Sequence, residues 1–318
     1  MHAHGATPVM KCKEKVGSSM FGSDKRPARA RAVMALLLVT VLATFGLSAS
    51  ALAVENEFSI FADCPLTTAS ACVHADTESG EVVIGSKAVP IEKTITLQGG
   101  LNETEAGELV FVAAKDGNTL SKAPQKVPGG LAGLVKCNEI KGSGLLEKAE
   151  RASCEVIFEN GVTGVTATTE LAAPASSIGI NLGNLLTAEG TALSLPIKVH
   201  LENPLLGSSC YVGSNASPIV LSLTTGTTSP PSPNKPITGN PGTLTFNPGG
   251  TLLTVSGNSL VNNSFAAPAT NGCGGIFEFL IGPIVNSSLG VPAAAGHNTA
   301  ILNGTLKQAS SEVVSEML

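Results

Sequence analysis

The stretch that decides the fold is Thr191–Thr225, which reads TALSLPIKVHLE, NPLLGSSCYVGSNA and SPIVLSLTT in order. Its first part alternates strictly between two sets of residues, and a period of two is that of a half-buried strand. The apolar set of this first part is Leu193, Leu195, Ile197, Val199 and Leu201. After a turn-rich connection, Ile219, Leu221 and Leu223 alternate in the same way. The pattern predicts a hairpin of two strands with one face in the core.

The other face of the first strand carries Pro196, Lys198, His200 and Glu202. Proline has no N–H to donate to a sheet, so Pro196 predicts that this strand lies at a sheet edge. His200 stands between a lysine and a glutamate on the outward face, and we expect a solvated side chain there.

Similar short runs recur along the chain between turn residues. They predict an all-β fold, an antiparallel β-sandwich or barrel-like sheet, stapled by disulfides and carrying one or two short helices. The expected strands are 57–62 (an edge), 81–85, 89–98, 108–114 (buried on both faces), 154–159, 163–171, 243–247, 251–256 and 298–306. The expected helices are a short turn near 184–188 and a longer one over 275–289, which Gly282-Pro283 is expected to break.

Two segments are predicted to be loops. Residues 115–134 form a long loop that is either functional or poorly ordered. Residues 226–243 are rich in proline and are expected to form an exposed polyproline-like loop or an interdomain linker. The amphipathic tail, 308–318, is expected to fray.

Residues 1–53 have the pattern of a secretory signal peptide. A basic segment ends at Arg31, an apolar run covers Ala32–Leu47, and small residues stand at Ala51 and Ala53. This order predicts export with cleavage after Ala53, and leaves 54–318 as a single β-rich domain in the extracellular space or cell envelope. The alternative is an uncleaved membrane anchor, which would be the chain's one contact with a membrane.

The charge of the chain is divided unevenly. The whole chain has a net charge of −5, but the leader holds more cations than anions, so the remainder is more acidic. Arg151 is the single arginine after the leader. Such a body has no basic patch for phosphates, which argues against nucleic acid and against anionic lipid as partners.

Six cysteines follow the leader, and an even count in an exported chain is typical of a disulfide framework. They are Cys64, Cys72, Cys137, Cys154, Cys210 and Cys273. Pairing each with its neighbour is the simplest of about fifteen connectivities, giving 64–72, 137–154 and 210–273. The alternative is a metal-binding or catalytic thiol, but no C-x-x-C occurs and the spacings match no zinc pattern.

No motif assigns a catalytic residue, a cofactor or a metal. His74 stands beside Cys72 in an expected loop, and His297 precedes the last expected strand. Neither belongs to H-E-x-x-H, and G-x-S-x-G is absent from the chain. Aromatic platforms for sugars are scarce, because Tyr211 is the single tyrosine and tryptophan is absent.

Two hypotheses for function remain open. The first is a secreted or cell-envelope β protein that acts without catalysis, as an interaction or structural protein. Its extracellular or cell-surface partner is unknown, and loops 115–134 and 203–216 would be its contact surfaces. The second is a secreted hydrolase with a dispersed site. Placing His200 or His297 near a serine and an acid in a pocket would favour the hydrolase.

Several phrases resemble a family of uncharacterised secreted proteins from actinobacteria. The resemblance covers nearly the whole chain after the leader and implies export, β-rich structure and paired cysteines. It implies no activity and no functional residue. The phrases are FADCPL (61–66), VPIEKTITLQGG (89–100), VPGGLAGLVKC (127–137), HLENPLLGSSCYVGS (200–214), LTTGTTSPP (223–231) and GHNTAILNGTL (296–306).

Overall fold

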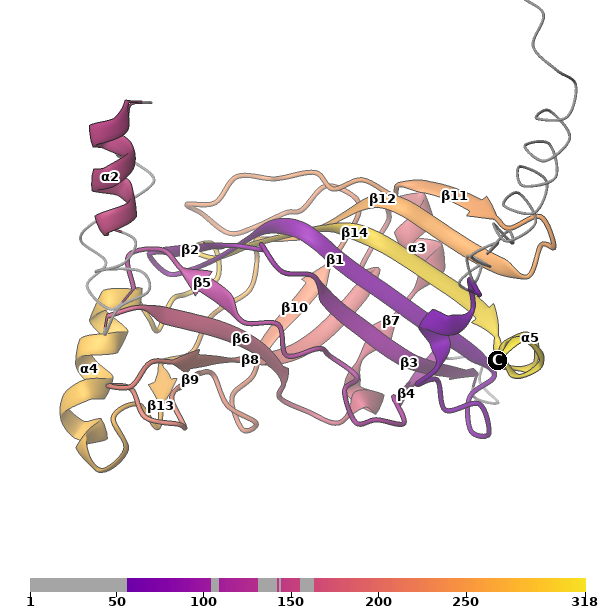
Figure 1. The fold of residues 1–318 in the computed structure, drawn as a ribbon, viewed down its shortest axis with the longest axis horizontal. Helices are drawn as coiled ribbons and strands as arrows, with labels where there is room; N and C mark the ends of the chain where they lie inside the picture. Colours follow the sequence, from indigo (N-terminus) through magenta and orange to yellow (C-terminus); the bar gives the residue numbers. More distant parts are fainter. Residues whose placement is uncertain (1–55, 104–108, 131–141, 143, 155–162) are drawn as a thin grey trace, which may run out of the picture. The chain divides into compact units, whose positions relative to one another are not determined.

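Two antiparallel sheets make up most of the structure, a computed structural model that describes residues 56–103, 109–130, 142, 144–154 and 163–318 (Figure 1). The expected all-β class, with antiparallel sheets and short helices, is confirmed. The leader and the expected strand at 154–159 lie outside the described residues, apart from the backbone of Cys154, which ends a helix.

The first sheet has the order β11-β12-β14-β1-β3-β4, and β2 pairs with β1. Its strands are β1 (Ala71–Ile84), β2 (Lys87–Pro90), β3 (Ile95–Glu103), β4 (Leu109–Ala113), β11 (Thr243–Phe246), β12 (Leu252–Asn262) and β14 (Thr299–Ser310). The expectation that 108–114 is buried on both faces is wrong. β4 ends the sheet, and Phe111 is its one buried residue.

The second sheet is built around β8 (Leu193–Glu202), which pairs with β6, β7, β9 and β10. The other strands are β5 (Gln125–Val127), β6 (Val165–Leu171), β7 (Gly179–Ile180), β9 (Tyr211–Val212), β10 (Ile219–Leu223) and β13 (Thr270–Asn271). The expected hairpin is present as β8 and β10, with Ile219 opposite Ile197. The apolar set of β8 faces the core, as its alternation predicts.

The prediction that Pro196 marks a sheet edge is wrong, because β8 is central. The carbonyl of Pro196 accepts a hydrogen bond from the N–H of Ala172, so its nitrogen faces the same side of the strand. On that side β6 has ended at Leu171, and β7 does not begin until Gly179, which lies opposite Ser194. The missing N–H therefore falls in a gap between two strands and breaks no ladder.

Register shifts in β1 and β12 keep aliphatic side chains on the inner face of the first sheet. The shifts lie between Thr77 and Ser79 and between Val255 and Asn258. An extra residue moves the following side chains to the opposite face. In β1 the inward set therefore changes from Val73 and Ala75 to Val82 and Ile84.

Four α-helices are present among the described residues: α2 (Leu145–Cys154), α3 (Leu182–Thr187), α4 (Glu278–Leu289) and α5 (Ser311–Met317). The helices expected near 184–188 and over 275–289 are confirmed as α3 and as the 3-10 turn η5 (Gly275–Phe277) followed by α4. The expected break at Gly282-Pro283 is wrong. Gly282 has no Cβ to meet the proline ring, and Gly282 and Val285 are buried, so packing stabilises the turn.

The two ends of the described chain pack together outside the first sheet. Residues 57–62, expected to be a strand, instead contain the 3-10 turn η1 (Ser59–Phe61). Phe58 and Phe61 pack in one cluster with Val314 of α5, whose side chain is fully buried. The prediction that the tail frays is therefore wrong, because α5 buries an apolar side chain.

The proline-rich segment 226–243 is not an interdomain linker. The strands β12 and β14, which follow it, lie in the same sheet as β1. The Asn234 amide donates to the carbonyls of Asn263 (3.0 Å) and Asn298 (2.9 Å), and the Asn263 amide donates to the carbonyl of Lys235 (2.8 Å). These bonds fasten the segment to the sheet.

Candidate functional site

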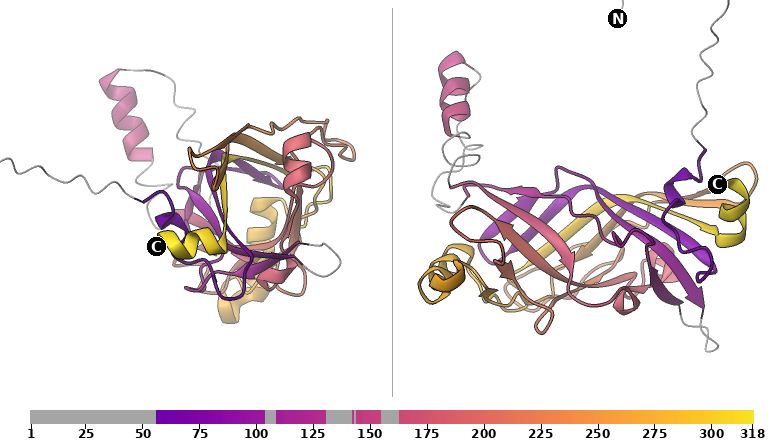
Figure 2. Two further views of the ribbon diagram at one scale, coloured as in Figure 1. Left: turned by 90° about the vertical axis from the view of Figure 1, so that its right-hand side faces the viewer. Right: turned by 60° about the horizontal axis from the view of Figure 1, so that its bottom comes forward.

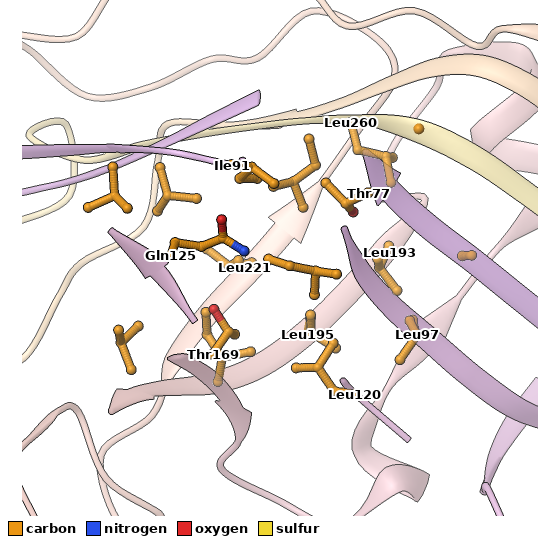
Figure 3. A pocket seen from close by; sticks show the side chains of 18 of the residues that line it. Thr77, Ile91, Leu97, Leu120, Gln125, Thr169, Leu193, Leu195, Leu221 and Leu260 are labelled. Carbon is orange, nitrogen blue, oxygen red and sulfur yellow. The ribbon is translucent and has the colours of Figure 1, made fainter. Parts of the chain in front are cut away.

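A cavity lies between the two sheets, and we call it the inter-sheet cavity. Figure 2 shows the backbones of the two sheets facing each other. The volume of the cavity is about 140 Å³, and its lining comes from the inward faces of both sheets (Figure 3). Figure 3 shows Leu195 and Leu221 of the second sheet and Leu260 of the first among the side chains around it. The alternating apolar residues that predict β8 as a strand therefore also line one wall of this cavity.

The lining of the inter-sheet cavity is mainly aliphatic. Most of its residues are Ala, Val, Ile or Leu, and none of the described lining residues is aromatic. Natural protein interiors have few voids larger than a water molecule. An engineered cavity of about 150 Å³ lined by leucine, isoleucine and phenylalanine stays dry and binds benzene. The inter-sheet cavity therefore has the size and chemistry to hold a small apolar group.

Gln125 brings a buried amide to the cavity wall, but its hydrogen bonds are made within the protein. Its Oε1 accepts from the N–H groups of Glu92 (2.9 Å) and Lys93 (3.0 Å). Its Nε2 donates to the carbonyls of Lys93 (2.8 Å) and Ala123 (3.1 Å). Gln125 thus holds the 92–93 turn against β5. The other polar residues of the lining are Asp76, Thr77, Lys87, Thr169, Asn258 and Thr305, so the aliphatic wall includes a polar minority with two charged residues.

A second cavity, of about 200 Å³, lies under α4, and we call it the α4 cavity. On the helix it is lined by Ile281, Ile284, Val285, Ser288 and Leu289. Val127, Leu201 and Leu289 line both cavities, so only these side chains and their neighbours stand between them. The two cavities form adjoining parts of one aliphatic interior.

The structure confirms two of the expected cysteine pairs, Cys64–Cys72 and Cys210–Cys273. The first lies in the cluster outside the first sheet, and the second joins the segments beside β9 and β13. The third expected pair, Cys137 and Cys154, lies outside the side chains that the structure describes. Disulfide bonds are compatible with an extracellular protein.

His200 is on the outward face of β8, as expected, but it is not solvated. Its ring stacks on Tyr211 with centroids 4.5 Å apart, and its side chain is 15% exposed. The Nζ of Lys198 lies 4.6 Å from the centroid of the Tyr211 ring and 3.7 Å from a carboxylate oxygen of Glu170. Burial, followed by the charge of Glu170, raises the pKa of Tyr211.

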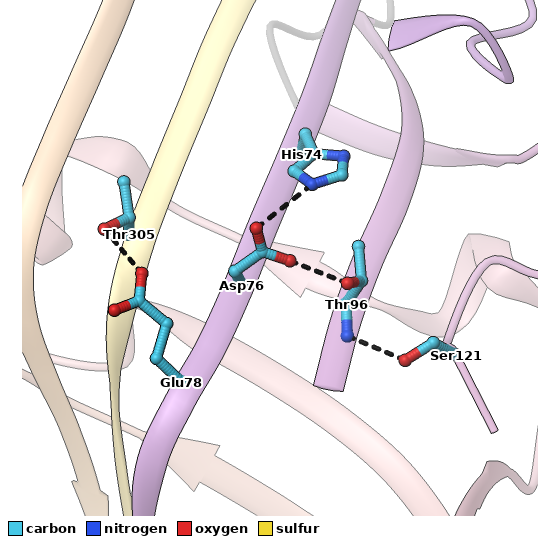
Figure 4. Close-up of polar contacts among 6 residues, drawn as sticks. All are labelled: His74, Asp76, Glu78, Thr96, Ser121 and Thr305. Atoms are coloured by element: carbon cyan, nitrogen blue, oxygen red, sulfur yellow. Dashed lines mark hydrogen bonds and ion pairs between the residues drawn. The ribbon is translucent and has the colours of Figure 1, made fainter. Parts of the chain in front are cut away.

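His74 lies in β1 and not in a loop, which corrects the expectation for this residue. Its Nε2 is 3.2 Å from Oδ2 of Asp76, and the hydroxyl of Thr96 donates to Oδ1 of Asp76 at 2.6 Å (Figure 4). Ser121 accepts from the backbone N–H of Thr96 at 2.8 Å. The serine therefore ties the 121 segment to β3 and is not paired with the histidine.

The histidines offer no hydrolase site among the described residues. His74 is on the first sheet, His200 is on the second, and His297 is exposed in the loop before β14. The acids nearest His200 are Glu170 and Glu202, at 3.9 and 3.8 Å, and no described serine joins them. A nucleophile, a base and an orienting acid are thus not brought together.

The described part of the chain holds no group of three His, Cys, Asp or Glu residues placed to bind a metal ion. Every helix in these ranges is too short or too polar to cross a membrane. Comparisons with protein-family models, with curated proteins and with solved structures found no match to this chain.

Sequence reasoning missed the two cavities. The inward aliphatic sets of β6, β8 and β10 were visible as alternation, but the same pattern is compatible with closely packed sheets. The absence of tryptophan and the low aromatic content of 3% were the one available signal, because large rings are the side chains that fill wide interiors.

Proposed function

We propose that this protein is a secreted or cell-envelope β protein that binds, without catalysis, one flexible aliphatic chain in its interior. The observation that carries the proposal is the mainly aliphatic interior made by the inter-sheet cavity of about 140 Å³ and the adjoining α4 cavity of about 200 Å³. Export follows from the signal-peptide pattern in 1–53, with cleavage after Ala53, and agrees with the two disulfides.

The chemistry of the lining selects the class of ligand. Each buried methylene contributes about 0.8 kcal/mol when it leaves water for an apolar site. A sugar would gain from aromatic platforms, and the described lining has none. A flexible acyl or isoprenoid chain adapts to a wall of leucine, isoleucine and valine. The mainly aliphatic lining predicts that the part of the ligand buried in the cavity is apolar.

Binding of a fluorescent fatty acid, cis-parinaric acid, tests the proposal. We expect one molecule to bind per protein, and unlabelled aliphatic chains to displace it. Ala75 lies on the inward face of β1 and lines the cavity, so Ala75→Phe fills the space with a ring. This change is expected to weaken binding about tenfold or more.

The matched control is Ala88→Phe, because Ala88 is an exposed residue of β2 and makes no part of the cavity lining. Circular dichroism establishes that both variants are folded, and Ala75→Leu serves as a smaller change if the phenylalanine is not accommodated. Equal binding of the probe by the wild type and the filled variants would show that the interior is not the site. An unbound probe would contradict the proposal directly.

A further inference from the structure

The outer face of η5 and α4 is an exposed apolar surface, and we call it the α4 face. It consists of side chains that are 55 to 87% exposed: Ile276, Phe277, Phe279, Leu280 and Ile284. The face contrasts with the buried side of the same helix, where Val285 is 4% exposed. Contiguous exposed apolar surface of this kind marks an interaction site on a folded protein.

The α4 face carries almost no charge. Glu278 is the one ionisable residue between Gly275 and Leu289. Its Oε1 accepts a hydrogen bond from the N–H of Gly272 at 2.6 Å, which directs the carboxylate toward the start of the helix. A partner that needs opposite charges for recognition would find none here. The α4 face therefore fits a partner whose own contact region is apolar, either at its surface or, as in a membrane, directly beneath a polar layer.

The α4 cavity opens beside this face. Ile284 and Leu205 line the cavity, yet each is more than half exposed, so the cavity reaches the surface between them. Inward, the cavity ends at Val127, Leu201 and Leu289, which also line the inter-sheet cavity. An aliphatic path therefore leads from the α4 face toward the interior, and Figure 1 places α4 at the opposite end of the sheets from α5.

We propose that the α4 face docks on the surface of a membrane of uncharged or zwitterionic lipids, and that the aliphatic ligand enters between α4 and Leu205. When a helix lies in the plane of a membrane, exposed Phe, Ile and Leu side chains enter the boundary between headgroups and acyl chains. The acidic body, with Arg151 as its one arginine after the leader, disfavours anionic lipid. The docking step stands on the exposed and nearly uncharged α4 face, whereas the entry step, and with it the preference for a lipid over a protein occupant, rests on the proposed function.

A lipid surface fits the α4 face better than a second protein for one geometric reason. A protein seated on this face would cover the opening of the α4 cavity and leave the aliphatic path without a source of ligand. A membrane covers the face with the same kind of molecule that the path accepts. From the sequence, contact with a membrane was expected only through an uncleaved leader. The α4 face would be a second membrane-binding surface, separate from the leader.

Cosedimentation with phosphatidylcholine vesicles tests the docking step. We expect the protein without residues 1–53 to bind the vesicles, and added phosphatidylserine not to strengthen binding. The double variant Phe277→Ser/Phe279→Ser removes two exposed rings and is expected to weaken vesicle binding at least about tenfold. The matched control is Phe246→Ser, because Phe246 is 58% exposed on β11 of the first sheet, away from α4.

Uptake of cis-parinaric acid separates docking from ligand binding. The serine double variant should bind monomeric probe from solution as the wild type does, but should extract it from vesicles more slowly. Ala75→Phe should lose the probe and keep vesicle binding. Failure of the probe to bind would overturn the proposed function, whereas vesicle binding reports on the α4 face independently.

Three results would overturn the docking proposal. The first is a wild-type protein that stays in the supernatant at every vesicle concentration. The second is equal loss of vesicle binding in the Phe246→Ser control. The third is a dimer in sedimentation that Phe277→Ser/Phe279→Ser dissociates, because this would make a second copy of the chain the occupant of the face.

Discussion

At the scale of single residues, Tyr211 is the side chain whose surroundings change its chemistry most clearly. Burial and the nearby charge of Glu170 raise its pKa above the ordinary value of about 10. The folded state therefore favours the neutral phenol. The raised pKa of Tyr211 therefore adds to the free energy of unfolding. This contribution is fully present below about pH 10, the ordinary pKa of tyrosine, and is lost as the pH rises through the raised pKa of the folded state.

We expect an ultraviolet absorbance titration of the folded protein to show a tyrosinate midpoint above the ordinary value. The signal belongs to Tyr211 alone, because the chain has one tyrosine and no tryptophan. Glu170→Gln removes the charge and should move the midpoint down, whereas Glu81→Gln, on the exposed side of β1, should leave it in place. An unshifted midpoint in the folded wild type would be evidence against this environment.

At the scale of elements, the pairing of β1 with β14 depends on a glycine at the register shift. Gly304 lies opposite Thr77, and a Cβ built on Gly304 would lie 1.7 Å from the carbonyl oxygen of Asp76. Backbone on both strands must then move apart. This close approach accounts for a glycine in the middle of the last strand, where its flexibility would otherwise weaken the strand.

Gly304→Ala is expected to lower the free energy of unfolding by about 2–3 kcal/mol, measured by urea denaturation. Gly249→Ala is the matched control, because it lies in the turn between β11 and β12, and the nearest atom to its added Cβ is 3.5 Å away. The same loss in both variants would mean that flexibility, and not the close approach to Asp76, decides the effect.

At the scale of the whole molecule, the two disulfides differ in the length of chain that they close. Cys210 and Cys273 are 63 residues apart, whereas Cys64 and Cys72 are 8 apart. In the chain-entropy description, a longer closed loop restricts the unfolded chain more. The 210–273 bridge also closes one end of the β9–β13 pair, next to the paired residues Tyr211 and Asn271.

Replacing both Cys210 and Cys273 by serine should lower the free energy of unfolding by about 4 kcal/mol, against about 2.5 kcal/mol for the Cys64 and Cys72 pair. Urea denaturation of the two double variants under non-reducing conditions measures the difference. A larger loss for the short loop would show that packing in the Phe58–Phe61 cluster, and not chain entropy, dominates.

The inward faces of β6, β8 and β10 and the pairs 64–72 and 210–273 could be predicted, because the alternation of apolar residues and the number and order of cysteines are visible in the sequence itself. The central position of β8 could not. From the sequence, Pro196 predicts an edge strand, because the gap between β6 and β7 that accommodates its missing N–H is visible only in the structure. The turn at Ser59–Phe61 and the unbroken α4 also depend on packing against distant residues, which outweighs local preference.

The sequence alone determined that strands with one aliphatic face would form two-layered β structure, because a period of two leaves each sheet with a side that must avoid water. The tertiary structure alone decided how far apart those faces lie. Ala75, Leu195 and Leu260 come from three distant parts of the chain, and the space between them depends on strand pairing and register across the whole fold. The cavity is therefore a property of the assembled sheets, because no single strand encodes the distance to the sheet opposite.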